Sequence, residues 1–416
     1  MPKFPCLLAL LVSAALPPSL SLAQQPVRLQ ADTPQQKAAA KAGPFREWRY
    51  YRSITLDTTA AGANVSGDVL AYPVAVALDA SSFDFRQARP DGSDLRFSSA
   101  ADQVVLPHAI EHWDAAGRAA LIWVKVPKVR GNSRERAFLM HWGRGDSDAS
   151  RSDVAKPAVT SRASVFDVED GFVGVWHLND EGGVTPDGYK DATANAAHGT
   201  GVNLAGDARV PARLGPGLSL AHAKTQWVKV DGDKRKLFDL TKAVTFSIWA
   251  RARSFSNRGD EARRSLPGYE TMFAKGDNSW RLQKFGIRDW HKPPADLLEI
   301  CVEQPPRADL CVVGKTDMAL DRWYHLVGVH EHPYVKFYVN GVLDKVETFD
   351  VDWTSGDHPV GIGNQSQFPD RGRSWDGVLD EARVLRVAKD QHWIKLDYES
   401  QREGQTFLSF GKVERR

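Results

Sequence analysis

Oxygen-bearing side chains in two separate segments have the chemical types that hold a hard cation. The polar loop Tyr189–Gly199 offers Asp191 and Asn195, and the segment LDEARV offers Asp380. Calcium takes six to eight oxygen ligands from carboxylates, amides and backbone carbonyls, so Asp191 and Asp380 are the ligands we expect for a structural Ca2+ ion. The alternative is a solvated loop in which Asp191 and Asn195 form local turns through side-chain-to-backbone hydrogen bonds.

Carboxylate pairs suited to glycoside hydrolysis, which needs two carboxyl groups about 5 Å or roughly 6.5–9.5 Å apart, are not evident. The run Asp167–Asp170 has alternate carboxylates, but it precedes the strand-like segment VGVWHL rather than lying within it. Asp380 and Glu381 are adjacent, so on a regular strand they point to opposite faces. No G-x-S-x-G, H-E-x-x-H or P-loop motif occurs. We therefore expect no enzyme, and a glycoside hydrolase is the least favoured function.

Candidate ligand-binding side chains lie in the central part of the chain. Trp290 stands in the irregular segment RDWHKPPAD, and the strand-like segment SWRLQKFG supplies Arg281 and Gln283. An exposed tryptophan can stack on a sugar ring while neighbouring polar groups bind its hydroxyls. The alternative is that these are ordinary loop and strand residues. We predict a carbohydrate site formed by Trp290, Arg281 and Gln283 on a concave face.

Cysteine placement indicates one disulfide. Cys301 and Cys311 flank the turn-rich segment EQPPRAD between two strand-like runs, an arrangement typical of a β-hairpin. In an oxidising compartment the two thiols should pair. A loop this short contributes roughly 2–3 kcal/mol by the chain-entropy estimate, so the folding energy must come mainly from hydrophobic cores. The alternative is two unpaired buried thiols.

The N-terminus predicts export. Lys3 precedes the apolar run Leu7–Leu16, and small residues lead to a cleavage position after Ala23, so residues 1–23 are expected to be a signal peptide. The run is shorter than the roughly 20 residues that span a bilayer, and no later stretch reaches that length. We therefore predict a periplasmic or secreted protein with a flexible leader over residues 24–44 and no transmembrane segment in the mature chain.

Size and charge narrow the class of partner. The chain has 416 residues, enough for two or more domains, with 54 basic and 52 acidic residues and a formal charge of +2. The two signs are interspersed, whereas nucleic-acid binding usually needs a clustered basic face. We expect no nucleic-acid partner. The 13 tryptophans suit β-sandwiches and sugar-binding surfaces.

Short apolar runs with alternating patterns predict an all-β protein. Runs such as YPVAVALD, AALIWVKVP and RAFLMHWG form a first β domain over residues 45–150, and a polar linker follows at 151–163. Residues 164–416 carry a second, larger set of strands, with a helical pattern only near Lys389–Tyr398 and a short tail. Within this set, the Asn340-Gly341 pair predicts a two-residue hairpin turn.

The order of these motifs resembles known families. The motifs AVTFSIWARA, DRWYHLVGVH, VKFYVNGVL, GIGNQS and WDGVLDEARV resemble a laminin-G-like, concanavalin A-like jelly roll over residues 164–390. The motifs FDFRQARPDGSDLRF, LPHAIEHWD, IWVKVP and FLMHWG resemble a bacterial domain of unknown function, numbered twenty-three forty-one. Some similar proteins continue into an inner-membrane proton channel of the ExbB/TolQ/MotA type.

The resemblance adds three expectations. It implies that the first and last strands of the jelly roll pair, which would bring Asp191 and Asp380 near each other. With the candidate residues Trp290, Arg281 and Gln283, the lectin-like domain leads us to expect a protein that recognises a carbohydrate or glycoconjugate, although such a fold does not by itself define a ligand. The alternative is a protein-interaction component of an energised envelope transport system, for which the EHWD motif (Glu111 to Asp114) offers contacts.

Overall fold

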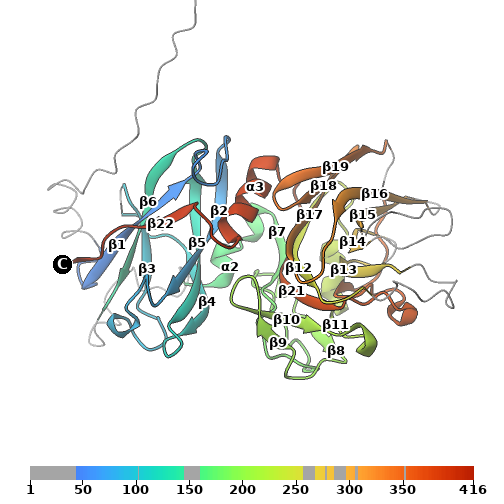
Figure 1. Ribbon diagram of the computed structural model, residues 1–416, viewed down its shortest axis with the longest axis horizontal. Helices are drawn as coiled ribbons and strands as arrows, with labels where there is room; N and C mark the ends of the chain where they lie inside the picture. The colour runs from blue at the N-terminus through green and yellow to red at the C-terminus, as the bar shows by residue number, and fades with distance from the viewer. Residues whose placement is uncertain are drawn as a thin grey trace, which may run out of the picture.

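A computed structural model describes residues 44–101, 103–144, 160–255, 268–276, 279–284, 297–304, 308–350 and 353–416. Figure 1 shows two β-rich units lying side by side, one formed mainly by the first third of the chain and the other by the rest. The expected all-β class, a small sandwich followed by a jelly roll, is confirmed. Among the described residues, no helix combines the length and apolar character needed to cross a bilayer.

The first domain is built from two antiparallel sheets. Within the described residues, one has the order β22-β1-β6-β3 with β23 also paired to β1, and the other has the order β2-β5-β4. The strands contributed by the N-terminal third are β1 (Tyr50–Asp57), β2 (Val69–Asp79), β3 (Arg96–Ser99), β4 (His108–Asp114), β5 (Ala119–Val129) and β6 (Arg134–Trp142).

The C-terminal end of the chain completes this first domain. Strands β22 (Leu408–Phe410) and β23 (Glu414–Arg415) pair antiparallel with β1, and the red strand β22 lies among the blue and green strands in Figure 1. The sequence assigned this tail to the jelly roll, and the structure corrects that placement. A tail this short shows no feature that distinguishes one sheet edge from another before the fold is known.

The second domain is a sandwich of two larger sheets. Within the described residues their orders are β19-β18-β17-β12-β21-β10-β9, with β7 also paired to β21, and β16-β15-β14-β13-β20-β11-β8. Their bounds are β7 (Phe172–Trp176), β8 (Thr200–Val202), β9 (Arg209–Pro211), β10 (Pro216–Leu220), β11 (Trp227–Val230), β12 (Ala243–Ala252), β13 (Glu270–Ala274), β14 (Arg281–Lys284), β15 (Leu297–Gln304), β16 (Ala308–Asp317), β17 (Trp323–Glu331), β18 (Tyr334–Val339), β19 (Val342–Thr348), β20 (Val360–Ile362) and β21 (Gly377–Leu385).

Two local predictions within the second domain are confirmed. Asn340 and Gly341 join β18 to β19 with φ values of 51° and 74°, the left-handed backbone that a two-residue hairpin turn of this kind requires. Cys301 and Cys311 lie directly opposite each other on β15 and β16 and form a disulfide. The helical pattern near the C-terminus corresponds to α3 (Gln391–Gln401), which begins at the Asp390 cap.

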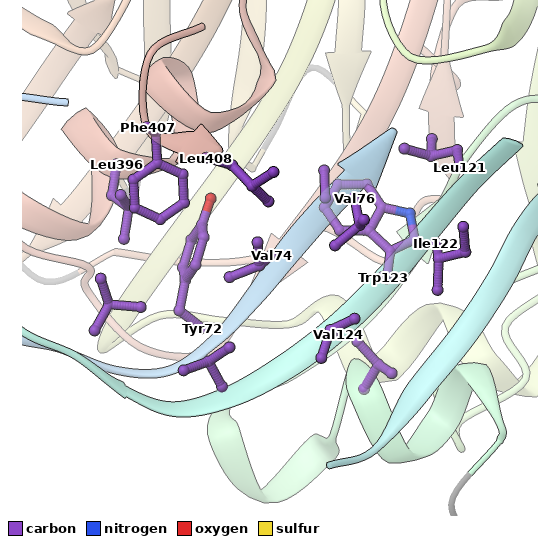
Figure 2. Packing of buried hydrophobic residues seen from close by; sticks show 14 of the residues in the cluster. Tyr72, Val74, Val76, Leu121, Ile122, Trp123, Val124, Leu396, Phe407 and Leu408 are labelled. Atoms are coloured by element: carbon purple, nitrogen blue, oxygen red, sulfur yellow. The ribbon is translucent and has the colours of Figure 1, made fainter. Parts of the chain in front are cut away.

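A shared hydrophobic core joins the two domains. It combines side chains from β2 and β5 of the first domain with residues of helix α2 (Arg162–Val165), of β7 and β17, of α3 and of the segment after α3. Figure 2 shows Tyr72 and Val74 from the first domain near Leu396, Phe407 and Leu408 from the C-terminal segment, with Trp123 beside Val76 further along the same core. Ion pairs from Lys125 Nζ to Asp170 (2.5 Å) and Asp167 (3.1 Å) add a polar contact at the edge.

Substitution of Phe407 tests whether the C-terminal segment that returns to the first domain stabilises the shared core. Phe407 is 1% exposed, whereas Val413 in the same tail is 48% exposed. Phe407→Ala should lower the free energy of unfolding by about 3–5 kcal/mol because it leaves a cavity in the core, and Val413→Ala should change it by less than about 0.5 kcal/mol. Urea denaturation of both variants measures this, and equal small effects would contradict a tail that is part of the core.

Candidate functional site

Arg281 and Gln283 lie on β14 but are not exposed. Leu282 between them points into the sandwich core, so Arg281 and Gln283 share the opposite face of the sheet, where they are 2% and 1% exposed. Gln283 Nε2 donates to Glu299 Oε1 at 2.6 Å. Both side chains are thus buried, and the carbohydrate site expected from them stays a prediction. Trp290 lies outside the described residues, and its contact with a ligand stays a prediction.

The Asp191 carboxylate already has a full set of hydrogen-bond donors. It accepts from the backbone N–H groups of Val175, Thr193 and Ala197, each at 2.9 Å, and from the Thr193 hydroxyl at 2.7 Å. Asn195 Nδ2 donates to the Val173 carbonyl at 2.8 Å. The contacts with Thr193 and Ala197 are local turns, as the alternative expected, whereas Val175 and Val173 belong to β7, and the Asp191 carboxylate is buried rather than solvated. Burial raises the Asp191 pKa despite these donors.

Asp380 has a different environment from Asp191. The first and last strands of the jelly roll do pair, through β7 and β21, but Asp380 Oδ2 accepts a hydrogen bond from the Leu214 backbone N–H at 2.7 Å. The carboxylate thus holds the turn between β9 and β10. Burial raises the Asp380 pKa well above its ordinary value, and the nearby Glu381 raises it further. Calcium binding by Asp191 and Asp380 stays a prediction.

A β-bulge in β21 changes the direction of Glu381. Leu379 and Ala382 both face the sandwich core although two residues separate them, Glu381 has φ of 51°, and the register to β12 shifts at this point. A bulge places two consecutive residues opposite one on the neighbouring strand. Asp380 and Glu381 therefore both leave the core face and point toward the first domain. The prediction that they point to opposite faces is wrong because it assumed a regular strand.

Glu381 takes part in a buried ionic cluster between the domains. His177 Nδ1 lies 2.7 Å from Glu381 Oε1 and 3.3 Å from Glu111 Oε2, and the three side chains are at most 2% exposed. Glu111 comes from β4 of the first domain, and His177 follows β7 of the second. Glu111 also accepts hydrogen bonds from Trp123 Nε1 at 2.5 Å and from Asn179 Nδ2 at 3.1 Å.

A second set of charges extends this cluster toward helix α3. Arg383 donates to Glu381 Oε2 at 2.7 Å and to Asp397 Oδ1 at 3.0 Å. Asp397 also lies 3.2 Å from His325 Nε2 and accepts from the Tyr72 hydroxyl of the first domain, likewise at 3.2 Å. The sequence pointed to Glu111 through the EHWD motif, but it indicated no role for His177 or His325. Their partners are remote in the chain, so no local spacing could reveal them.

The electrostatics of the cluster follow from burial and mutual contact. Burial raises the Glu111 pKa to about 8. The nearby Glu381 charge also raises it, whereas His177 lowers it. Burial opposes protonation of His177, but the two carboxylates outweigh it and raise its pKa. The Glu381 pKa is lowered, because His177 and Arg383 together outweigh the effect of burial. These groups are almost completely enclosed, and their contacts join the two domains.

A groove that is accessible to solvent lies beside this cluster at the domain junction. It has a volume of about 340 Å³ and is lined by β2 and β5 of the first domain, by the turn between β9 and β10, and by the segment after α3. A neighbouring hollow of about 330 Å³ shares His112, Ala119 and Gly215 with it. Volumes of this size at domain interfaces are typical of small-ligand sites. We name the two hollows together the junction groove.

Comparison with protein families matches two models to this chain. A model described as domain of unknown function DUF2341 matches residues 91–178, and one described as the concanavalin A-like lectin/glucanases superfamily matches residues 222–395. The chain thus carries the two domains, in the order that the sequence motifs indicated, and its second domain has a lectin-like fold. No curated protein matches the chain. The resemblance to channel-associated proteins stays a prediction.

Several solved structures share part of the fold. The binding domain of Paraclostridial Mosquitocidal Protein 1 is 14% identical, with a TM-score of 0.42 over 56% of this chain and 53% of that one. Domain 4 of AbnA, an arabinanase from Geobacillus stearothermophilus solved with arabinotriose, is 16% identical, with a TM-score of 0.39 over 56% and 98%. The binding domain of botulinum neurotoxin DC, solved with rat synaptotagmin II, is 12% identical, with a TM-score of 0.40 over 57% and 53%. This chain thus spans about half the length of the two toxin chains, and we base no functional conclusion on these likenesses.

The raised pKa of Glu111 predicts that the free energy of unfolding falls as the pH rises. Between its ordinary value of 4.5 and about 8, the folded protein retains the Glu111 proton that the unfolded chain has lost. The stability contributed by this group is therefore complete below pH 4.5 and declines up to about pH 8, by at most about 1.4 kcal/mol per pH unit. His177, whose pKa is also raised, acts in the same direction above its ordinary value of 6.5.

Replacement of Glu111 by glutamine tests this assignment. Glu111→Gln keeps the shape of the protonated group, so the variant should gain stability relative to the wild type as the pH rises from 5 to 8. Urea unfolding at several pH values measures the difference, with Glu181→Gln as control because that carboxylate is 76% exposed. A difference between Glu111→Gln and wild type that is constant over this range would contradict the raised pKa.

Proposed function

We propose that this chain is a secreted or periplasmic, non-enzymatic protein that binds a carbohydrate or glycoconjugate. The single observation that carries the proposal is the junction groove, an accessible hollow of ligand size formed where a lectin-like domain meets its partner domain. Both domains contribute walls to this groove, and a shared core holds them together. The groove therefore offers a preorganised site, which lowers the entropic cost of binding a ligand.

The arrangement of carboxylates supports binding rather than glycoside hydrolysis. Hydrolysis needs an acid and a second carboxylate on either side of the scissile bond. Glu403 is the one carboxylate among the described residues that line the junction groove, and its side chain is 90% exposed. Glu111 and Glu381 lie close to each other, but both are enclosed and engaged with His177.

A protein partner is the second candidate. The observation that favours it is a group of exposed apolar side chains on the hairpin β18–β19, whose outer strand β19 is at the edge of its sheet. This group consists of Tyr334, Val342, Leu343 and Val346, which are 41–60% exposed. Exposed apolar patches of this kind often mark contact sites for other proteins. An envelope component related to the ExbB/TolQ-type channels is the partner that the sequence resemblance suggests.

A glycan-binding measurement on residues 24–416 tests the proposal. We expect saturable binding to a subset of glycans on an array that includes peptidoglycan fragments, confirmed by calorimetry. A chelator identifies any contribution of calcium, and N-terminal sequencing of the exported protein tests cleavage after Ala23. The absence of binding to every glycan would contradict the proposal and favour the protein partner.

The Trp290→Ala variant separates the two possible glycan sites. If the site predicted from the sequence binds the sugar, this substitution should abolish binding, since stacking on the indole ring would be lost. If the junction groove binds the sugar, the affinity of the variant should equal that of the wild type. Val342→Lys is the control for a surface substitution away from both sites, because Val342 is exposed. Trp323→Ala is not used, because Arg251 packs on the Trp323 ring and the substitution would also disturb that contact.

A further inference from the structure

We infer that Arg213 in the junction groove binds the carboxylate of an acidic saccharide. This inference rests on the proposed function and adds the chemical class of the ligand and the residue that selects it. Arg213 lies in the turn between β9 and β10, and it lines the groove opposite Ala77 and Leu121 of the first domain. The sequence analysis did not single out this residue.

Two contacts fix the position of Arg213. Asp380 accepts a hydrogen bond from the backbone N–H of the following residue, Leu214, at 2.7 Å, which anchors the turn to β21. The Arg213 guanidinium lies over the Trp249 ring at 5.9 Å from its centroid, and Trp249 is in turn held by a hydrogen bond from its Nε1 to Gln401 Oε1 at 2.7 Å. The guanidinium is therefore placed before any ligand arrives.

The charge of Arg213 is only weakly neutralised. Its Nε atom is buried and has no hydrogen-bond partner among the described residues. Its ion pair with Glu403 is long, at 3.5 Å, and the Glu403 side chain is 90% exposed whereas that of Arg213 is 17% exposed. An ion pair of this length with an almost fully solvated carboxylate contributes little. A ligand carboxylate that enters the groove can replace Glu403 and form the two parallel hydrogen bonds that an arginine fork favours.

Two other arginines line the junction groove, and they differ in how far their charge is neutralised. Arg402 also lines the groove, but its guanidinium is engaged by Glu399 and by the carbonyl oxygens of Glu403 and Gly404. Arg209 lines the adjoining hollow, and its Nε is likewise buried without a partner among the described residues. Arg209 pairs with Glu181, which is 76% exposed, at 3.3 Å. The groove therefore carries positive charge at two positions along its length and suits a ligand that bears negative charge.

The remaining walls suit a sugar ring that carries the carboxylate. They are formed largely by small and aliphatic side chains, namely Ala75, Ala77, Ala119, Leu121 and Leu214, against which the C–H groups of a ring can pack. Half-buried His112 lies at the point where the two hollows meet and offers a hydrogen bond to a hydroxyl. A bare inorganic anion would leave these apolar walls unused, and a neutral sugar would leave Arg213 without a full partner.

Calorimetric titration of the mature chain tests the inference. The probes are a galacturonic acid trisaccharide and a muramic acid-containing disaccharide, which carry the carboxylate on different sugars, and their neutral counterparts. We expect at least one acidic saccharide to bind at least tenfold more tightly than its neutral counterpart at 150 mM salt, with a smaller preference at 500 mM because salt screens the ion pair. Sodium acetate and phosphate serve as anion controls.

Four variants show whether Arg213 is the residue that selects the acidic saccharide. Arg213→Gln should remove at least tenfold of the affinity for the acidic saccharide and leave the affinity for the neutral one within twofold, and Arg213→Lys should restore part of it. Arg130→Gln is the matched control, because Arg130 is a 66% exposed arginine of the first domain. Should Arg213→Gln fail to fold, Ala119→Trp obstructs the groove from an exposed position, and it should abolish binding with the melting temperature unchanged.

The possible results separate this inference from the proposed function. Equal binding of acidic and neutral saccharides, or acidic binding that keeps its affinity in Arg213→Gln, would overturn the role of Arg213 while leaving a glycan-binding protein. Binding of acetate or phosphate as tightly as of the saccharide would overturn the sugar component. Absence of binding to any saccharide would overturn both.

Discussion

The contact between Glu111, His177 and Glu381 fixes the placement of the two domains together with the hydrophobic core that they share. Two carboxylates and an imidazole are removed from water at the junction, with the nearest atoms 2.7 Å and 3.3 Å apart. Burial of charges is costly unless their partners are well placed, and Arg383, Trp123 and Asn179 supply the further hydrogen bonds. Because the partners come from both domains, a shift of one domain against the other would leave buried charges unpaired. The joint therefore has one favourable geometry, and the junction groove beside it has walls in fixed positions.

A single bulge in β21 links this joint to the candidate binding residue. The left-handed backbone at Glu381 directs both Asp380 and Glu381 away from the sandwich core. Glu381 then contacts His177 in the joint, while Asp380 holds the backbone of the turn that carries Arg213. Two neighbouring carboxylates on one strand thus support the domain contact and the groove.

The sequence predicted those features that depend on neighbouring residues. Strand alternation, the hairpin turn at Asn340-Gly341, the Cys301–Cys311 pair and the helix near the C-terminus are local patterns, and the structure confirms each. Both families were also identified from ordered motifs. The return of the tail to β1, the bulge at Glu381 and the burial of Arg281 depend on register and on contacts between remote segments. Arg213 was missed for the same reason, since its environment is created by residues of other strands and of the first domain that are remote from it in the chain.

The shared core and the buried ionic cluster predict that the two domains form one cooperative unit, on which the proposed site at their junction depends. Differential scanning calorimetry of the mature chain at pH 6 tests it directly. The shared core and buried joint predict a single transition, with the calorimetric enthalpy of unfolding equal to the van't Hoff enthalpy. Two separate transitions, or a calorimetric enthalpy well above the van't Hoff value, would show that the domains unfold independently and would contradict a rigid junction groove.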